Sequence, residues 1–158
     1  MQTKTIVHIS IIAALYAVFT ILLTPISYGV VQLRLSEFLK GLVIINPLFS
    51  IGIGIGTFFA NLNSPMVGPL ELIWMPITDI VGGFIAWFVY RITNYLISMI
   101  VYSFTTALSV SIMLYILGLG GYWLLFASIF ISELIILVGS IPINKYIARY
   151  LNDSVAQR

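Results

Sequence analysis

Three charged side chains, Arg34, Glu37 and Lys40, lie three residues apart in a chain where charge is scarce. If this stretch begins a helix, the spacing places all three near one face, with Phe38 and Leu39 to one side. A charged side chain among membrane spans costs about 3 kcal/mol or more, so by default it marks a ligand site or a pathway. We therefore expect one face to meet a polar ligand and the other to pack in the bundle.

Three more carboxylates, Glu71, Asp79 and Glu133, interrupt apolar stretches. An acid inside a membrane must be neutral, paired or hydrated, and Glu133, flanked by apolar residues, is the most costly of the three. Two roles stay open for Asp79. It could bond the backbone of a helix loosened by Pro76, or it could take part in transport.

The segment that begins at Asn61 is the richest in turn residues. It must lie outside hydrocarbon or line a cavity. The side chain of Asn61 offers donors and acceptors that suit the edge of a heterocyclic base, although asparagine is also ordinary in turns.

The composition is that of an integral membrane protein. The chain has 158 residues, of which 61% are hydrophobic and 8% charged, and its mean hydropathy is +1.13. Soluble domains carry roughly 25% charged residues. The absence of cysteine excludes disulfides, cysteine-ligated zinc and thiol catalysis. No basic run indicates nucleic acid, and the single histidine has no metal-ligand partner at a suitable spacing.

The apolar stretches predict an all-α protein that forms one domain over residues 1–158. At about 20 residues a span, the length allows six or seven crossings. We expect six transmembrane helices at residues 5–27, 35–45, 48–62, 70–91, 95–117 and 122–143.

The distribution of basic residues predicts the orientation. With six spans both termini lie on one side, and the positive-inside rule makes that side cytoplasmic. That side collects Lys4, Arg91, Lys145, Arg149 and Arg158, whereas the other has Arg34 and Lys40. The external half would then hold Arg34, Glu37, Asn61, Glu71 and, if it lies near the outer end of its span, Glu133.

Small residues predict where helices approach closely. Ala13 and Ala17 share a helix face, which could pack within the bundle or form a docking groove for a partner protein. The alternating glycines of residues 51–56 lack the Lys and Ser/Thr of a phosphate loop, so they favour close helix packing.

Four motifs in order resemble the QueT family, the substrate-capture (S) components of energy-coupling factor (ECF) transporters in prokaryotes, which are linked to uptake of queuosine precursors. The resemblance covers about residues 6–145. The motifs are Ala13-xxx-Ala17, Val31-Gln32-Leu33-Arg34-Leu35-Ser36-Glu37, Gly56-Thr57-Phe58-Phe59-Ala60-Asn61-Leu62, and Ser132-Glu133-Leu134 with Gly139 and Pro142.

This resemblance implies a six-helix S-component bundle in the prokaryotic cell membrane, without catalytic activity or cofactor. It would bind substrate externally, with help from the first loop, and join a transmembrane coupling protein and two ATPases that hydrolyse ATP. Ala13 and Ala17 match the docking surface toward the coupling protein. The ligand would be 7-aminomethyl-7-deazaguanine, its nitrile precursor or queuine.

For such a ligand, Glu37 and Glu133 would accept the paired N–H donors of the guanine edge and the aminomethyl cation. Arg34 would bind the ligand's carbonyl or hold Glu37 in place, and the second role is favoured. Asn61 would add contacts to the edge of the base. Glu71 belongs to the same predicted substrate site, and an aromatic ring such as Trp74 or Phe38 would stack on the base.

The chain departs from the family pattern at four positions. Glu71 replaces an aspartate, Met75 a glycine and Ser132 a glycine, while Lys40 is atypical. These changes affect the prediction of the substrate more than that of the class. An S component for another vitamin or heterocycle and an autonomous secondary carrier remain alternatives. Scattered carboxylates, one histidine and no cysteine argue against an enzyme.

Overall fold

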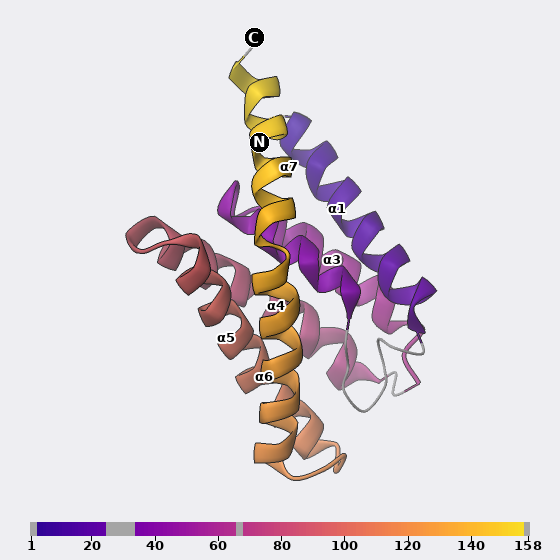
Figure 1. The fold of residues 1–158 in the computed structure, drawn as a ribbon. Coiled ribbons are helices and arrows are strands. Elements are labelled where there is room, and N and C mark those ends of the chain that lie inside the picture. Colours follow the sequence, from indigo (N-terminus) through magenta and orange to yellow (C-terminus); the bar gives the residue numbers. More distant parts are fainter. Residues whose placement is uncertain (1–2, 25–33, 66–67, 157–158) are drawn as a thin grey trace.

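The computed structural model describes residues 3–24, 34–65 and 68–156, and within these ranges every regular element is helical (Figure 1). In chain order the elements are α1 (Thr3–Leu22), η1 (Leu35–Ile44), α3 (Phe49–Asn61), α4 (Pro69–Ile92), α5 (Tyr95–Ile116), α6 (Tyr122–Gly139) and α7 (Ile141–Ala156).

In this part of the chain, four helices are long and apolar enough to cross a bilayer: α1, α4, α5 and α6. The apolar helix α3 has 13 residues, and η1 is a 3₁₀ helix of 10 residues. Each is about 20 Å long, against the roughly 30 Å of a hydrocarbon core. The all-helical prediction is confirmed, whereas the count of six full spans is not.

The short helix η1 lies at the centre of the bundle. It contacts α1, α3, α4, α6 and α7, while α1 with α3, α3 with α4, α4 with α5, and α5 with α6 form the main neighbouring pairs. Two side chains bond carbonyls of η1: the Tyr95 hydroxyl donates to Gly41 at 2.9 Å, and the Asn144 amide donates to Phe38 at 2.8 Å. These bonds give partners to two carbonyl groups of a largely buried helix.

Glycines bring α3 close to α1, as the pattern in residues 51–56 predicts. A Cβ atom added at Gly52 would lie 2.6 Å from the Ile9 carbonyl oxygen, and one at Gly56 would lie 2.8 Å from that of Ala13. Both distances are shorter than any real Cβ contact. Only glycine therefore permits this approach.

The C-terminal part of the chain divides at Ser140, between α6 and α7. The predicted span at residues 122–143 therefore ends earlier, at Gly139, and Pro142 lies in the first turn of α7, where a proline costs no helical hydrogen bond. Figure 1 shows the start of α1 and the end of α7 at the same end of the bundle.

Candidate functional site

Lys40 is the centre of a buried ionic cluster. Its Nζ atom lies 2.5 Å from Glu37 Oε2, 2.8 Å from Asp79 Oδ1 and 3.1 Å from Glu133 Oε1. The Lys40 side chain is fully buried. The three acids come from η1, α4 and α6, so a single ammonium group ties three helices together.

The geometry of η1 explains how its charges share one face. A 3₁₀ helix has three residues per turn, so side chains three apart eclipse one another. Arg34 directly precedes η1, Glu37 lies in its first turn and Lys40 follows one turn later. All three line the same small cavity, as their spacing predicts.

Hydroxyl groups hold the carboxylates of this cluster in place. The Tyr16 hydroxyl donates to Glu37 Oε1 at 2.7 Å, and the Thr57 hydroxyl donates to Asp79 Oδ2 at 2.5 Å. The ring of Tyr102 lies 5.2 Å from Lys40 Nζ, within the range of a cation–π interaction. Bonds to an ionised acceptor are stronger than neutral ones. Two of the three carboxylates at Lys40, those of Glu37 and Asp79, are therefore held in this arrangement by hydroxyl donors.

A second group of polar side chains surrounds Arg34. Its Nη2 atom lies 3.9 Å from Glu71 Oε1, and its Nη1 atom donates to Asn61 Oδ1 at 3.3 Å. The Asn61 amide lies 3.4 Å from the sulfur of Met75, which also contacts Arg34 at 3.8 Å. Arg34 and Met75 line the same cavity as Lys40, so the two groups adjoin.

The combined site carries excess negative charge. Four of the chain's five acids are in it, together with two cations, which gives a formal charge of −2 when all are ionised. None of the six side chains is more than 8% exposed. A buried carboxylate is costly unless it is protonated or an opposite charge compensates it, and a cationic ligand would compensate these acids in their ionised form.

The cavity at the centre of the site has a volume of about 20 Å³. This is room for one water molecule but not for a two-ring heterocycle. Two buried atoms of its lining, Glu133 Oε2 and Thr106 Oγ1, have no hydrogen-bond partner within the described part of the chain. The lining is formed by Arg34, Glu37, Lys40, Met75, Asp79, Thr106, Val110, Ile129 and Glu133.

The structure places most of the sequence-predicted site residues together. Glu37 and Glu133 meet at Lys40, and Arg34, Asn61 and Glu71 form the adjoining group. The first-loop residues of the family motif, Val31, Gln32 and Leu33, lie outside the described residues.

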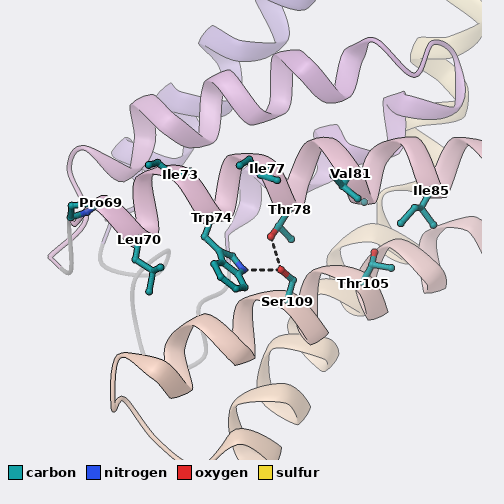
Figure 2. Close-up of a pocket in the computed structure, with 11 residues that line it drawn as sticks. Pro69, Leu70, Ile73, Trp74, Ile77, Thr78, Val81, Ile85, Thr105 and Ser109 are labelled. Atoms are coloured by element: carbon teal, nitrogen blue, oxygen red, sulfur yellow. Dashed lines mark hydrogen bonds between the residues drawn. The ribbon is translucent and has the colours of Figure 1, made fainter.

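Trp74 lies elsewhere, in an apolar groove of about 590 Å³ between α4 and α5. Its Nε1 atom donates to the Ser109 hydroxyl at 2.9 Å, and that hydroxyl also bonds Thr78 at 2.6 Å (Figure 2). Phe38, the other aromatic residue expected to stack on a ligand, lies edge-on to Phe19 with ring centroids 5.8 Å apart. Trp74 is therefore not part of the charged cavity in this structure.

The two alanines of the predicted docking face differ in exposure. Ala13 is 9% exposed and lies where α3 approaches α1, whereas Ala17 is partly exposed. The Ala13 position thus serves packing within the bundle, one of the two interpretations left open by the sequence.

Two charged residues of the cluster had no assigned role from the sequence. Lys40 was expected on the same helix face as Arg34 and Glu37 and was noted as atypical for the family, but no partner was assigned to it. Asp79 accepts from Thr57 and pairs with Lys40, so its carboxylate is engaged away from the backbone near Pro76. The hydroxyls of Tyr16 and Thr57 gave no signal in the sequence, because such residues are common in apolar helices.

Comparison with known proteins places this chain in a family of transporters. The family model described as QueT transporter matches residues 6–149. A relative named "Queuosine precursor transporter QueT", from Lactococcus lactis subsp. cremoris (strain MG1363), is 37% identical over 84 residues, which are 52% of this chain and 44% of the relative. The matched segment therefore spans less than half the relative's length. No solved structure matches. With its long apolar helices, this is a multi-pass membrane protein, and the chain belongs to the QueT transporter family.

Proposed function

We propose that this protein is the substrate-binding S component of an ECF transporter and that it imports a queuosine precursor, either a 7-deazaguanine or queuine. One observation carries the proposal. A member of the QueT transporter family buries four carboxylates, Arg34 and Asn61 inside an apolar helical bundle. Charged groups inside a membrane protein are expensive and mark ligand sites or pathways.

The chemistry of a 7-deazaguanine suits this arrangement. Its pyrimidine edge presents adjacent N–H donors, which a carboxylate accepts as a pair, and its carbonyl accepts from a guanidinium or amide. Glu37 and Glu133 both reach the Lys40 ammonium, so they lie close enough to contact one small molecule. Arg34 and Asn61 supply the donors for the carbonyl.

Binding of such a ligand requires the site to open. Ligand pockets for small molecules usually measure about 300–1,000 Å³, and the charged cavity holds about 20 Å³. The side chains around Lys40 must therefore rearrange as the ligand enters. The ligand stabilises the open arrangement by its greater affinity for it.

In this proposal the protein acts in the prokaryotic cell membrane, with both termini in the cytoplasm. Two observations support this orientation. The start of α1 and the end of α7 lie at the same end of the bundle (Figure 1). Arg91 and Lys145 line one groove of about 490 Å³, which collects positive charge on one side, as the positive-inside rule requires of the cytoplasmic face.

The partners would be a transmembrane coupling protein and two ATPases. Ala13 and Ala17, both on α1, are the residues proposed for docking, but Ala13 is buried and Ala17 is partly exposed. Because Ala13 packs toward α3, direct contact with the coupling protein falls to Ala17 and to its exposed neighbours Ala14 and Val18.

Thermal unfolding of the purified protein with a panel of ligands tests the substrate class, because a ligand of the folded state raises the unfolding temperature. The panel contains 7-aminomethyl-7-deazaguanine, its nitrile analogue, queuine, guanine, riboflavin and thiamine. We expect stabilisation by the first three. Selective stabilisation by a vitamin would instead indicate an S component of another specificity.

Uptake into proteoliposomes tests the transporter class. The proposal predicts concentrative uptake only with the coupling protein, the ATPases and ATP. Concentrative uptake by the purified protein alone would show an autonomous secondary carrier and contradict the proposal.

A further inference from the structure

We propose that the Lys40 ammonium occupies the subsite for a primary ammonium group of the substrate, which displaces it on binding. This inference rests on the proposed function and adds a specificity to it. The protein would select 7-aminomethyl-7-deazaguanine over its neutral nitrile analogue, and Lys40 would be the residue that the ligand's aminomethyl group replaces.

The donor geometry supports this assignment. A lysine ammonium has three N–H donors, and here it lies against three carboxylates at 2.5, 2.8 and 3.1 Å. An aminomethyl group ends in the same CH₂–NH₃⁺ unit, with the same charge, size and number of donors. The three acids would therefore bind it as they bind Lys40.

The charge of the site supports the same ligand. Three carboxylates face one lysine ammonium, so with all three acids ionised the cluster carries a formal charge of −2 even with Lys40 in place. Glu133 Oε2 and Thr106 Oγ1 line the cavity without hydrogen-bond partners among the described residues, and both side chains are more than nine-tenths buried. These atoms offer unused acceptors beside the ammonium position.

The volume of the cavity requires displacement rather than joint occupancy. About 20 Å³ accommodates a water molecule beside Lys40, but not a methylene-ammonium group joined to a bicyclic ring. The lysine side chain is flexible and carries its charge at the end of a four-carbon stem, so it can withdraw while the backbone of η1 stays in place.

Dissociation constants of the full-length protein for the aminomethyl and nitrile compounds test the inference. We compare wild type, Lys40→Met and the control Lys145→Met, which removes an exposed lysine on α7. Since Lys40→Met removes the internal competitor, we expect the preference for the amine over the nitrile to rise at least tenfold. The control should keep the wild-type preference. An unchanged preference, or an equal loss of affinity for both compounds, would overturn the inference.

A ligand series on the wild-type protein tests the subsite even if Lys40→Met does not fold. The N-trimethylated aminomethyl compound keeps the charge but lacks N–H donors. We expect it to bind at least tenfold more weakly than the primary amine, and equal binding would overturn the inference. If none of the aminomethyl compound, the nitrile compound and queuine binds wild type, the proposed function itself fails. If the aminomethyl and nitrile compounds both bind but the Lys40 variant leaves their ratio unchanged, only the inference fails.

Discussion

Lys40 and Glu133 are 93 positions apart in the sequence, yet Lys40 Nζ lies 3.1 Å from Glu133 Oε1 in the interior of the bundle. This pair joins the central 3₁₀ helix η1 to α6, and the other two carboxylates at Lys40 come from η1 itself and α4. The ionic cluster thus serves two purposes. It links η1, α4 and α6, and in the proposed function its acids also bind the substrate.

The bond from Tyr16 to Glu37 predicts a measurable contribution to stability. Tyr16→Phe removes only the hydroxyl that donates to Glu37 Oε1 at 2.7 Å. A hydrogen bond to a charged group contributes about 1.5–3 kcal/mol, so we expect the free energy of unfolding to fall by that amount. Denaturant unfolding in detergent measures it. Tyr146→Phe is the matched control, because Tyr146 is 70% exposed. Equal effects of the two variants would contradict the assigned bond.

The contact between α1 and α3 predicts that Gly56 does not tolerate a side chain. A Cβ at Gly56 would lie 2.8 Å from the Ala13 carbonyl oxygen, which forces the two backbones apart. We expect Gly56→Ala to destabilise the protein by about 1–3 kcal/mol, the usual cost of overpacking. The control is Gly139→Ala at the end of α6, where a Cβ meets nothing within 4 Å. If Gly56→Ala unfolds at the same temperature as wild type, α1 and α3 do not approach as closely at Gly56 as described.

The exposed side of α1 predicts a separation of binding from transport. Ala17→Leu adds bulk at a partly exposed position, so it should leave ligand affinity unchanged and abolish uptake by the reconstituted transporter. Ala13→Leu is the informative comparison, since Ala13 is buried and the larger side chain should lower the unfolding temperature itself. Normal uptake by a folded Ala17→Leu protein would refute the docking assignment.

Composition and hydropathy predict the fold class and most of the helix boundaries. The stretch expected at 70–91 is Pro69–Ile92, and the one expected at 95–117 is Tyr95–Ile116. Such long apolar segments leave the backbone no alternative to an α-helix in a membrane. Residues 35–45 were expected as a membrane span, but Leu35–Ile44 is the 3₁₀ helix η1. Side chains of α5 and α7 donate hydrogen bonds to its carbonyls. Those partners lie more than 50 residues away and leave no local pattern.

The site was predictable by residue type but only partly by position. The rarity of acids in an apolar chain identifies Glu37 and Glu133, yet it does not show that Lys40 joins them, since that depends on how three helices pack. Trp74, in contrast, was predicted to lie in the site but lies outside it. It directly precedes Met75, which lines the charged cavity, but one residue turns the side chain about 100° around the axis of α4, and Trp74 bonds Ser109 of α5 instead. Proximity to the site residues in sequence therefore does not place an aromatic side chain beside them in space.

The dissociation constant of 7-aminomethyl-7-deazaguanine for wild type, Glu37→Gln and Glu133→Gln tests the central claim most directly. Isothermal titration on purified protein gives this value, and the control is Lys145→Gln on the exposed face of α7. Each glutamine keeps the shape of the side chain but removes its charge. We expect each acid variant to bind at least tenfold more weakly, about 1.4 kcal/mol, while it stays folded. Wild-type affinity in both folded acid variants would contradict the claim that these buried carboxylates bind the substrate.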